Sequence, residues 1–341
     1  MSATKNGADL ADLAQRFDAD RQHLRAVAFR LLGSIADADD AVQSAWLKAS
    51  RAAGIDGIDN LTGWFTTITA HDAFDHLRAR KQRAEQPLAD AGEFDRLAAT
   101  APADEDVLLA DSVGSALLVV LDRLSPAQRV AFVLHDVFAV PFETIGEVLD
   151  RSPTAAKKLA SRARSRLHQG TPAQPGRLAQ HLEVVEAFLA ASRGGDIATL
   201  LELLAPDVVR RVDRLLIPDD VPAELRGARE VAEETRRFAT RAQRGVVMLI
   251  DGVPGVVIAP RGRAQILLRL GIGADNRIHA IDISADTDQL HRAVLALPPG
   301  ACQADLSPIG YQGHETWPAG VVGDEARTGA RCSVSRSDGE P

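Results

Sequence analysis

The sequence lacks the features on which disulfide-bonded, metal-binding and membrane-spanning proteins depend. It has two cysteines in 341 residues, Cys302 and Cys332, far apart in a segment rich in glycine and proline. Their separation excludes a Cys-x-x-Cys metal or redox motif, and two inert reduced thiols are expected in preference to a redox switch. No apolar run reaches the ~18 residues of a membrane-spanning helix, and the polar start MSATKNGADLADLAQ has no signal-peptide pattern. We therefore expect a cytoplasmic protein with no metal, no cofactor and no membrane partner.

The sequence does have the length and the apolar content for several domains. Hydrophobic residues make up 45% of the 341 residues, so sizeable cores can form. A chain of this length suggests two or three domains. Changes in composition along the chain predict where they begin and end.

Charge is distributed unevenly, with a strongly basic segment in a chain whose formal net charge is -8. Residues 151–169 contain no acidic residue. Their basic residues are Arg151, Lys157, Lys158, Arg162, Arg164 and Arg166. Such a local inversion of charge indicates a polyanionic partner.

The basic segment is predicted to be the second helix of a helix-turn-helix. Ser152 suits an N-cap and Pro153 the first helical position, so the preceding helix, PFETIGEVLD, must end near Asp150. At about 100° per residue, the apolar side of the second helix carries Ala156, Leu159, Ala160, Ala163 and Leu167. The opposite side carries Thr154, Lys157, Lys158, Ser161, Arg162 and Ser165. An ordinary solvated basic helix is the alternative for this segment taken alone.

Two helical regions flank an acidic stretch. Residues 9–85 have apolar positions at spacings of three and four, interrupted by a helix stop at Gly33-Ser34. Residues 86–112 are rich in aspartate and glutamate and contain one basic residue, Arg96, a composition typical of a linker. The helical pattern resumes over residues 113–170, where Ser125-Pro126 marks another helix start, and TPAQPGR then marks a domain boundary.

In combination, these segments resemble a known family. LLGSIADADDAVQSAWLKA and WFTTITAHDAFDHLRAR are similar to region 2 of extracytoplasmic-function (group IV) RNA polymerase sigma factors. LSPAQRVAFVLHDVFAVPFETIGEVLDRSPTAAKKLASRARSRL is similar to their region 4. The resemblance implies two all-α domains, a region 2 helical bundle at 9–85 and a region 4 helix-turn-helix at 113–170. It also implies a promoter-recognition subunit of RNA polymerase, without catalytic activity of its own.

The resemblance assigns polymerase contacts to the helix DADDAVQSAW. This helix would dock on a coiled coil of the polymerase β′ subunit through Asp39, Asp40, Gln43 and Trp46. The β subunit of the core enzyme is a further expected partner. The acidic linker at 86–112 would thread toward the active-site and RNA-exit channel, unless it is a simple solvated tether.

The resemblance also assigns the minus-ten promoter element to the helix over residues 64–80. The residues expected to melt and read it are Trp64, Thr67, His71, Arg78, Arg80 and Lys81. An aromatic surface and cations suit a flipped base and a single strand. Packing in the core is the alternative for Trp64, and complementing the helix dipole is the alternative for the basic end. His71 and Asp72 depart from the residues that many family members carry, which affects the expected minus-ten preference.

The minus-thirty-five element is assigned to the basic helix. The residues expected to bind it are Thr154, Lys157, Lys158, Ser161, Arg162 and Arg166. Lys157 and Lys158 are placed for base edges in the major groove, and Arg162 and Arg166 for phosphates. Binding would be weak in isolation and strong when polymerase fixes the spacing of the two DNA-reading helices.

Residues 178–290 predict a domain of another class. A helix, a Gly-Gly-Asp turn and a short helix ending at Ala205-Pro206 precede a strand with Val208, Val209 and Val212. A further helix and four strand-like runs follow, which predict an antiparallel meander. The order and the segment AFLAASRGGDIATLLELLAPDVV resemble a SnoaL-like (NTF2-like) α+β cone-shaped domain. In sigma factors that carry this extension, the resemblance implies an intramolecular regulator that acts by contact.

The SnoaL-like fold often encloses a pocket, so a small-molecule ligand is a further candidate partner. The titratable residues on or beside the predicted strands are Asp207, Asp213, His279 and Asp282. A surface or rim position is the favoured alternative for each, because no activated pair can be identified. IDISADTDQL resembles the closing motif of the subgroup, with Thr287 where proline is common. Residues 291–341 are expected to be disordered.

Two other functions stay open at this stage. One is a SnoaL-type enzyme or ligand sensor fused to a DNA-binding module, whose activity would depend on Asp207, Asp213 or His279. The other is a stand-alone helix-turn-helix repressor. The region 2 segment opposes the repressor, because a repressor has no need of a polymerase-docking helix.

Overall fold

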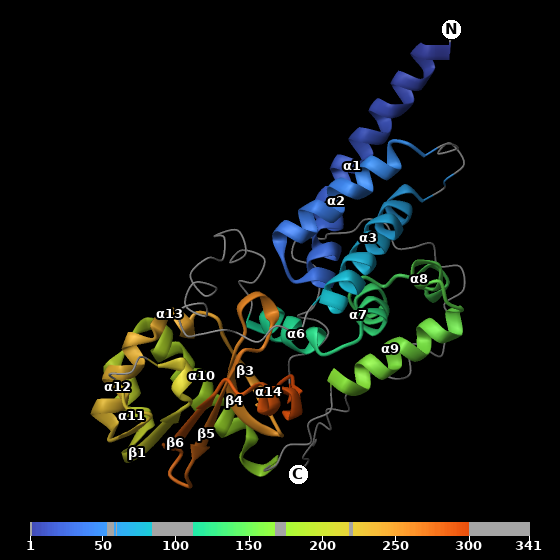
Figure 1. Cartoon of the computed structure of the whole chain (residues 1–341). Coiled ribbons are helices and arrows are strands. Elements are labelled where there is room, and N and C mark those ends of the chain that lie inside the picture. Colours follow the sequence, from blue (N-terminus) through green and yellow to red (C-terminus); the bar gives the residue numbers. More distant parts are fainter. Residues whose placement is uncertain are drawn as a thin grey trace, which may run out of the picture. The chain divides into compact units, whose positions relative to one another are not determined.

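The computed structural model describes residues 2–52, 58, 60–83, 112–167, 175–217 and 221–299. Most of the predicted linker, both cysteines and most of the predicted tail lie outside these residues. The N-terminal half is helical (Figure 1). Its elements are α1 (Ser2–Leu32), α2 (Ile35–Ala49), α3 (Leu61–Arg83), α6 (Ser112–Asp122), α7 (Pro126–Phe132), the π-helical turn η2 (Val133–Val137), α8 (Phe142–Leu149) and α9 (Pro153–Leu167).

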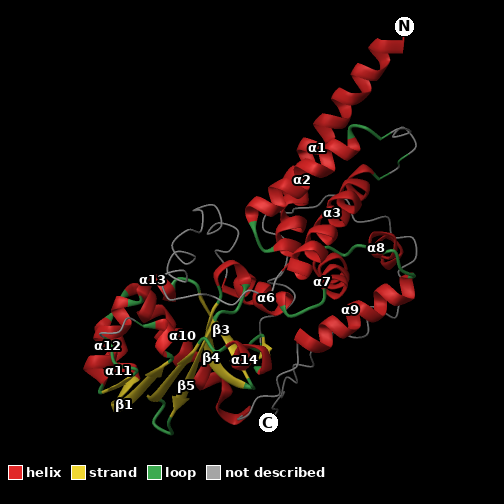
Figure 2. Ribbon diagram, in the orientation of Figure 1, coloured by secondary structure: helices red, strands yellow, loops and turns green. Residues whose placement is uncertain are grey.

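The C-terminal part mixes helices and strands. Its helical elements are η3 (Pro175–Arg177), α10 (Leu178–Gly194), α11 (Ile197–Leu203), η4 (Arg214–Leu216), α12 (Ala228–Arg237), α13 (Ala239–Ala242), η5 (Pro260–Gly262) and α14 (Thr287–Arg292). Its strands are β1 (Leu204–Val212), β2 (Glu224–Arg226), β3 (Gly245–Ile250), β4 (Val253–Ile258), β5 (Ile266–Ile272), β6 (Ile278–Ser284) and β7 (Leu295–Ala296). Figure 2 shows that the strands of the described chain are confined to this part. None of the described helices is long and apolar enough to cross a membrane.

Local signals set the starts of the N-terminal helices. Ser34 caps α2 by accepting a hydrogen bond from the amide of Asp37, at 3.3 Å, and Gly33 before it has the positive φ of 73° that glycine tolerates. Ser125 and Gln128 form a reciprocal capping box at the start of α7. The helix stop predicted at Gly33-Ser34 and the helix start predicted at Ser125-Pro126 are confirmed.

The helices α1, α2 and α3 pack as a bundle around aromatic rings. The Phe17 ring lies with its centroid 5.2 Å from that of Trp46 and 5.0 Å from that of Phe65. Phe65 is fully buried. Asp72 of α3 is also buried and forms an ion pair with Lys48 of α2. The charge of Lys48 compensates the burial of this carboxylate.

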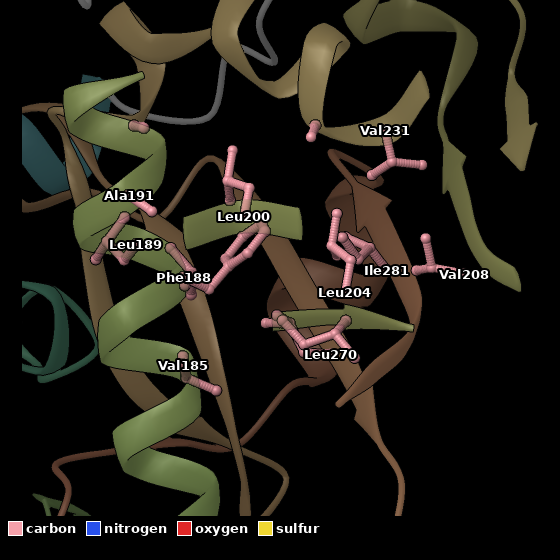
Figure 3. Close-up of a cluster of buried hydrophobic side chains, with 14 of the residues drawn as sticks. Val185, Phe188, Leu189, Ala191, Leu200, Leu204, Val208, Val231, Leu270 and Ile281 are labelled. Atoms are coloured by element: carbon pink, nitrogen blue, oxygen red, sulfur yellow. The ribbon is translucent and has the colours of Figure 1, made fainter. Parts of the chain in front are cut away.

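The seven described strands form one sheet in the order β2-β1-β6-β5-β4-β3-β7. Strands β3 to β6 form the predicted antiparallel meander. Strand β1 joins its edge by pairing in parallel with β6, a pairing between segments far apart in the sequence. α10 packs against β3 and β4, and α12 packs against β1. Figure 3 shows Val185, Phe188 and Leu189 of α10 in the core beside Leu270 and Ile281 of the sheet.

Two boundary predictions in this part need correction. The second short helix ends at Leu203, and β1 begins at Leu204, before the predicted stop at Ala205-Pro206. The register of β1 on β6 shifts between Leu204 and Val209, and this irregularity accommodates a proline inside the strand. The disorder predicted from residue 291 is wrong for the start of that segment, because β7 pairs with β3 through buried Leu295 and Ala296.

α6 is apolar on every side. Its residues from Ala116 to Leu121 are all buried, which a helix with one solvated face does not allow. The helix packs against β3 and η5 of the C-terminal domain. Gly262 of η5 has a φ of 70°, and a Cβ built there would lie 2.6 Å from the Cβ of Leu118. Only glycine therefore permits this approach without a shift.

Candidate nucleic-acid interface

The turn between α8 and α9 follows directly from its sequence. α8 ends at Leu149, and Asp150 after it adopts a left-handed φ of 51°. The helix end predicted near Asp150 is confirmed. Ser152 Oγ accepts a hydrogen bond from the amide of Ala155, at 3.3 Å, and Pro153 begins α9. The side of α9 that packs on α7 and α8 is formed by Ala156, Ala160, Ala163 and Leu167, all buried. The three alanines allow close packing, and the burial of this side leaves the charged side facing outward.

The outward side of α9 carries the residues predicted for it. Thr154, Lys157, Lys158, Ser161, Arg162 and Arg166 are all exposed. Two basic residues have protein partners: Arg164 donates to the buried Asp136 at 2.7 Å, and Arg166 Nη1 donates to Gln128 Oε1 at 3.2 Å. In the described part of the chain, no hydrogen bond or ion pair holds Lys157, Lys158 or Arg162. The arrangement leaves three cations available to an external anion.

The residues predicted on α3 divide into two groups. At about 100° per residue, Trp64, Thr67, His71 and Arg78 share one stripe about 60° wide. Arg80 lies on the other side of the helix, where its Nη1 donates to the main-chain carbonyl of Leu32 at 2.9 Å. The structure therefore brings four of the six residues together and gives Arg80 a different partner, at the end of α1.

Within the stripe on α3, exposure increases toward the C-terminal end. Trp64 and Thr67 are half-buried, whereas His71 and Arg78 are exposed, as is Lys81 one turn further on. The Trp64 ring centroid lies 5.5 Å from that of Phe65, so one side of the indole rests on the bundle core. Thr67 Oγ1 donates to the carbonyl of Gly63 at 2.8 Å, and His71 Nδ1 lies 3.4 Å from Asp75. The guanidinium of Arg78 lies 5.6 Å from the centroid of the Phe74 ring.

The outer face of α2 carries polar residues and one apolar residue that sequence reasoning missed. Asp39, Asp40 and Gln43 are exposed, and Trp46 is half-buried against Phe17. Asp39 is bound by Arg25 at 2.7 Å, which compensates its charge in part. Leu47, 46% exposed, follows Gln43 by four residues and shares its face. A leucine at an i+4 position on a polar face was the signal that could have identified it.

The C-terminal domain contains an apolar cavity between its sheet and its helices. Phe188, Leu189 and Ser192 of α10 line it on one side, and residues of α12, α13 and η4 line it on another. The sheet contributes one face of β1, β4, β5 and β6. The charged residues of its wall are Arg210, Glu234 and Arg241. Arg210 and Glu234 form a buried ion pair.

The four residues predicted for a pocket do not line this cavity. Asp207, His279 and Asp282 are exposed. Asp213 and Asp282 border a shallow polar depression instead, and Asp213 accepts hydrogen bonds from Ser284 Oγ at 2.7 Å and from the amide of Ala285 at 2.8 Å. The side chains of β1 alternate between the two faces of the sheet, and the cavity side is the one that carries Arg210 and Val212. Asp213 lies just past the end of β1 and accepts its two hydrogen bonds from residues at the end of β6.

His279 has partners of its own outside the cavity. Its Nε2 lies 3.0 Å from Asp275 Oδ1, and this hydrogen bond lowers the pKa of the Asp275 carboxyl. Its Nδ1 lies 3.7 Å from Asp207. Among the described residues, no group of three or more histidine, cysteine or carboxylate side chains is placed to hold a metal ion.

Comparison with known proteins decides the family. Residues 16–83 match the family described as Sigma-70 region 2, and residues 115–167 match Sigma-70, region 4. A Mycobacterium tuberculosis protein named "Probable ECF RNA polymerase sigma factor SigI" is 37% identical over 197 residues, covering 57% of this chain and 68% of the relative. The chain belongs to the extracytoplasmic-function (ECF) RNA polymerase sigma factors.

Other known proteins are similar to parts of this ECF sigma factor. ECF RNA polymerase sigma factor SigJ of Mycobacterium tuberculosis is 42% identical over 205 residues, covering 56% of this chain and 62% of SigJ. The match to the crystal structure of SigJ covers 81% of this chain and 97% of the SigJ chain, with 32% identity and a TM-score of 0.38. A SnoaL-like protein of unknown function from Burkholderia thailandensis covers 32% of this chain and 95% of its own, with 19% identity and a TM-score of 0.26.

The helical and α+β parts of the fold class predicted for this sigma factor are confirmed. Two helical sigma domains precede a C-terminal α+β domain. ECF sigma factors bind core RNA polymerase and promoter DNA, and the chain is accordingly a transcription initiation factor.

Proposed function

We propose that this sigma factor binds core RNA polymerase through α2 and divides promoter recognition between α3 and α9. Residues 9–85 would form region 2, 86–112 the acidic linker, 113–170 region 4 and 178–290 a regulatory domain. Residues after 299 have no part in the proposal. The protein would act in the cytoplasm, where core polymerase meets promoter DNA.

The outward face of α9 carries the proposal. Lys157, Lys158 and Arg162 are exposed cations without partners in the described chain, on a helix whose other side is buried. In a helix-turn-helix the N-terminal residues of the second helix meet base edges in the major groove. Thr154, Lys157 and Lys158 would therefore read the minus-thirty-five bases. Ser161, Arg162 and Arg166, further along the helix, would bind phosphates, which fix orientation.

The stripe on α3 supports a role in the minus-ten element. A flipped base needs an aromatic or apolar surface, and the single strand needs cations along its path. Trp64 and Thr67 are half-buried next to the exposed His71, and Arg78 and Lys81 follow on the same side. Arg80 contributes in another way, by tying α3 to the end of α1.

The outer face of α2 supports docking on the β′ subunit. Asp39, Asp40, Gln43 and Trp46 would form this contact, with the β subunit as a further partner. Exposed Leu47 adds apolar area beside Gln43. Interfaces commonly combine such an apolar residue with a polar surround.

Contacts between α6 and the C-terminal domain support intramolecular regulation. Asp122, at the end of α6, lies 3.8 Å from Arg263, and Leu118 packs on Gly262. Arg123 donates to the carbonyl of Leu290 in α14, within the IDISADTDQL segment. A conformational change in the C-terminal domain would therefore alter the contacts of the first helix of region 4.

Reconstitution with purified core polymerase tests the proposal. The full chain is expected to select start sites on promoter DNA that core polymerase alone ignores. The double variant Lys157→Ala, Lys158→Ala should lose this selection and keep polymerase binding, because α2 is unchanged. Arg237→Ala, which removes an exposed arginine of α12, is the matched control and should behave as wild type. Tight binding of duplex DNA without polymerase, together with no start-site selection, would contradict the proposal.

The apolar cavity favours one alternative, a ligand sensor or SnoaL-type enzyme fused to a DNA-binding module. For the enzyme, Asp207, Asp213 or His279 would have to act on the ligand, yet all three lie outside the cavity wall. The sensor would bind DNA in a ligand-dependent way without polymerase. Measuring duplex binding with and without core polymerase separates it from the leading proposal.

A further inference from the structure

The cavity of the C-terminal domain has an apolar wall whose charged residues already have partners within the protein. We propose that it binds a slender, uncharged molecule with an alkyl chain and one carbonyl oxygen, of the class of medium-chain ketones. The hydrocarbon part lies on the sheet, and the carbonyl accepts a hydrogen bond from Nε of Arg210. The inference rests on the proposed function only in its consequence, that such a molecule regulates this sigma factor through its C-terminal domain.

The alkyl part of the ligand is indicated by the floor of the cavity, an aliphatic row that crosses four strands. Val212 of β1 pairs in register with Ile283 of β6, Ile283 with Leu268 of β5, and Leu268 with Val256 of β4. Partners in register project from the same face of a sheet, so these side chains form a continuous surface. Val212, Leu268 and Ile283 are half-buried. A hydrocarbon chain lying on the row would remove their remaining apolar area from water.

The size of the cavity favours a slender molecule. Its volume is about 90 Å³, within about 770 Å³ of space free of atoms that includes open solvent at the mouth. The smaller figure is below the ~150 Å³ of a cavity that holds benzene. An alkyl chain that enters from the mouth therefore fits better than a fused ring system.

The charged residues of the wall favour an uncharged ligand, because each of them is engaged within the protein. Arg210 and Glu234 form a buried ion pair. Arg241 donates to the carbonyl of Leu216 at 2.6 Å, and its guanidinium lies 4.8 Å from the centroid of the Phe238 ring. A carboxylate or an ammonium group that entered the cavity would lose its hydration and meet only side chains that already have partners. An uncharged molecule avoids this cost.

The carbonyl oxygen of the ligand is indicated by a donor that lacks an acceptor. The terminal nitrogens of Arg210 bind Glu234 and two main-chain carbonyls, the latter at 2.9 and 3.2 Å, whereas its buried Nε has no hydrogen-bond partner among the described residues. The hydroxyl groups of Ser192 and Thr235, also in the wall, donate to carbonyls of their own helices. A buried donor without an acceptor is destabilising, and a ligand carbonyl would satisfy it without bringing a charge.

Calorimetric titration of the full-length chain with three probes of equal chain length tests the absence of charge. The probe 2-octanone is expected to bind. Octanoate and octylamine, which are charged at neutral pH, should bind about tenfold more weakly or worse, because their desolvation is not compensated in the cavity. A series from 2-butanone to 2-decanone establishes the chain length that the cavity takes.

Variants that affect one probe and spare another separate recognition from damage to the fold. Glu234→Gln removes the partner of the Arg210 charge, so octanoate should gain about tenfold in affinity while 2-octanone changes little. Arg210→Lys keeps a positive charge opposite Glu234 and removes Nε, so 2-octanone should lose up to about tenfold while heptane keeps its affinity.

Two further variants test the place of binding. Val212→Phe should abolish the binding of 2-octanone by filling the cavity while keeping a strand-forming residue. Arg237→Gln, exposed on α12, is the control and should leave the affinity unchanged.

Three results would overturn the inference: no ketone of the series binds at millimolar concentration, octanoate or octylamine binds wild type as tightly as 2-octanone, or Val212→Phe retains the affinity. Promoter-directed transcription with core polymerase is measured in parallel. If transcription proceeds and no ketone binds, the ligand inference is wrong and the proposed function stands. If 2-octanone binds and no start site is selected, the proposed function is wrong and the site stands.

Discussion

Nη2 of Arg123 donates a hydrogen bond of 2.7 Å to the main-chain carbonyl of Leu290 in α14. Nη1 of the same residue lies 3.5 Å from the carbonyl of His291. A cation at the C-terminal end of a helix complements the helix dipole. Burial at this contact lowers the pKa of the Arg123 guanidinium, against the weaker influence of Asp122. One side chain thus joins the end of α6 to the C-terminal domain.

Arg123→Ala is expected to lower the free energy of unfolding by about 1–3 kcal/mol, because the partly buried carbonyl of Leu290 loses a charged donor. Denaturant unfolding of the full chain measures the loss, and hydrogen exchange should rise in α6 and α14 together. Arg292→Ala is the control, because within the described chain its exposed side chain makes only a surface pair with Asp288 at 3.7 Å. Unchanged exchange in α14 would contradict the contact.

Arg162→Ala and Lys157→Ala should affect promoter binding in different ways. Loss of a phosphate contact at Arg162 should weaken binding to all promoters and reduce the salt slope of log K by about 1. Loss of a base contact at Lys157 should relax preference at one minus-thirty-five position by about 1–3 kcal/mol. Holoenzyme affinities for a set of single-base promoter variants, measured across a salt series, distinguish the two. Equal effects of both variants on every promoter would contradict the division of roles on α9.

Leu47→Asp should weaken the association with core polymerase, whereas Leu10→Asp should not. The two leucines are matched in exposure, at 46% and 45%, and differ in helix: Leu47 lies on the proposed docking face of α2 and Leu10 lies on α1. Burying a charge in an interface is expected to cost about tenfold or more in affinity. Competition between labelled wild type and each variant for core polymerase measures the difference. Equal affinities would remove Leu47 from the docking face.

Stability should fall as the pH drops below the ordinary pKa of His23. Burial lowers this pKa from 6.5, with Asp20 opposing the shift, while Nε2 lies 3.2 Å from Thr66 Oγ1 and the ring packs edge-on against Phe138. As the pH falls through 6.5 the unfolded chain takes up a proton that the folded chain resists, so acid favours unfolding. His23→Gln should remove this part of the pH dependence. Urea unfolding of both proteins at pH ~7.5 and ~5.5 gives the change in the free energy of unfolding between the two pH values. An equal change in wild type and variant would contradict the prediction.

The helix-turn-helix could be predicted from the sequence because its signals are local. Ser152, Pro153 and the small residues of α9 specify its start and its buried face within a few turns. The apolar cavity of the C-terminal domain could not be predicted, because its sheet face depends on the register of four strands. The parallel pairing that brings Val212 next to Ile283 joins residues far apart in the chain, and no local pattern encodes it.

Arg80 and Leu47 illustrate the same limit in the helical half. Their types and spacing are visible in the sequence, but their partners depend on tertiary packing. Arg80 lies where α3 passes the end of α1, and it donates a hydrogen bond there to the Leu32 carbonyl. Leu47 stays exposed because no described helix covers that face of α2.

The burial of α6 on all sides limits how this sigma factor can be controlled. If a protease cut between α9 and α10 and the C-terminal domain departed, Leu118 and its neighbours would lose the cover of β3 and η5. An apolar helix that becomes exposed to solvent promotes self-association and degradation. We therefore expect cleavage at this point to inactivate the chain, in contrast to proteins in which an inhibitory segment covers an already stable surface. We expect its control to be reversible, with the C-terminal domain retained in every active state.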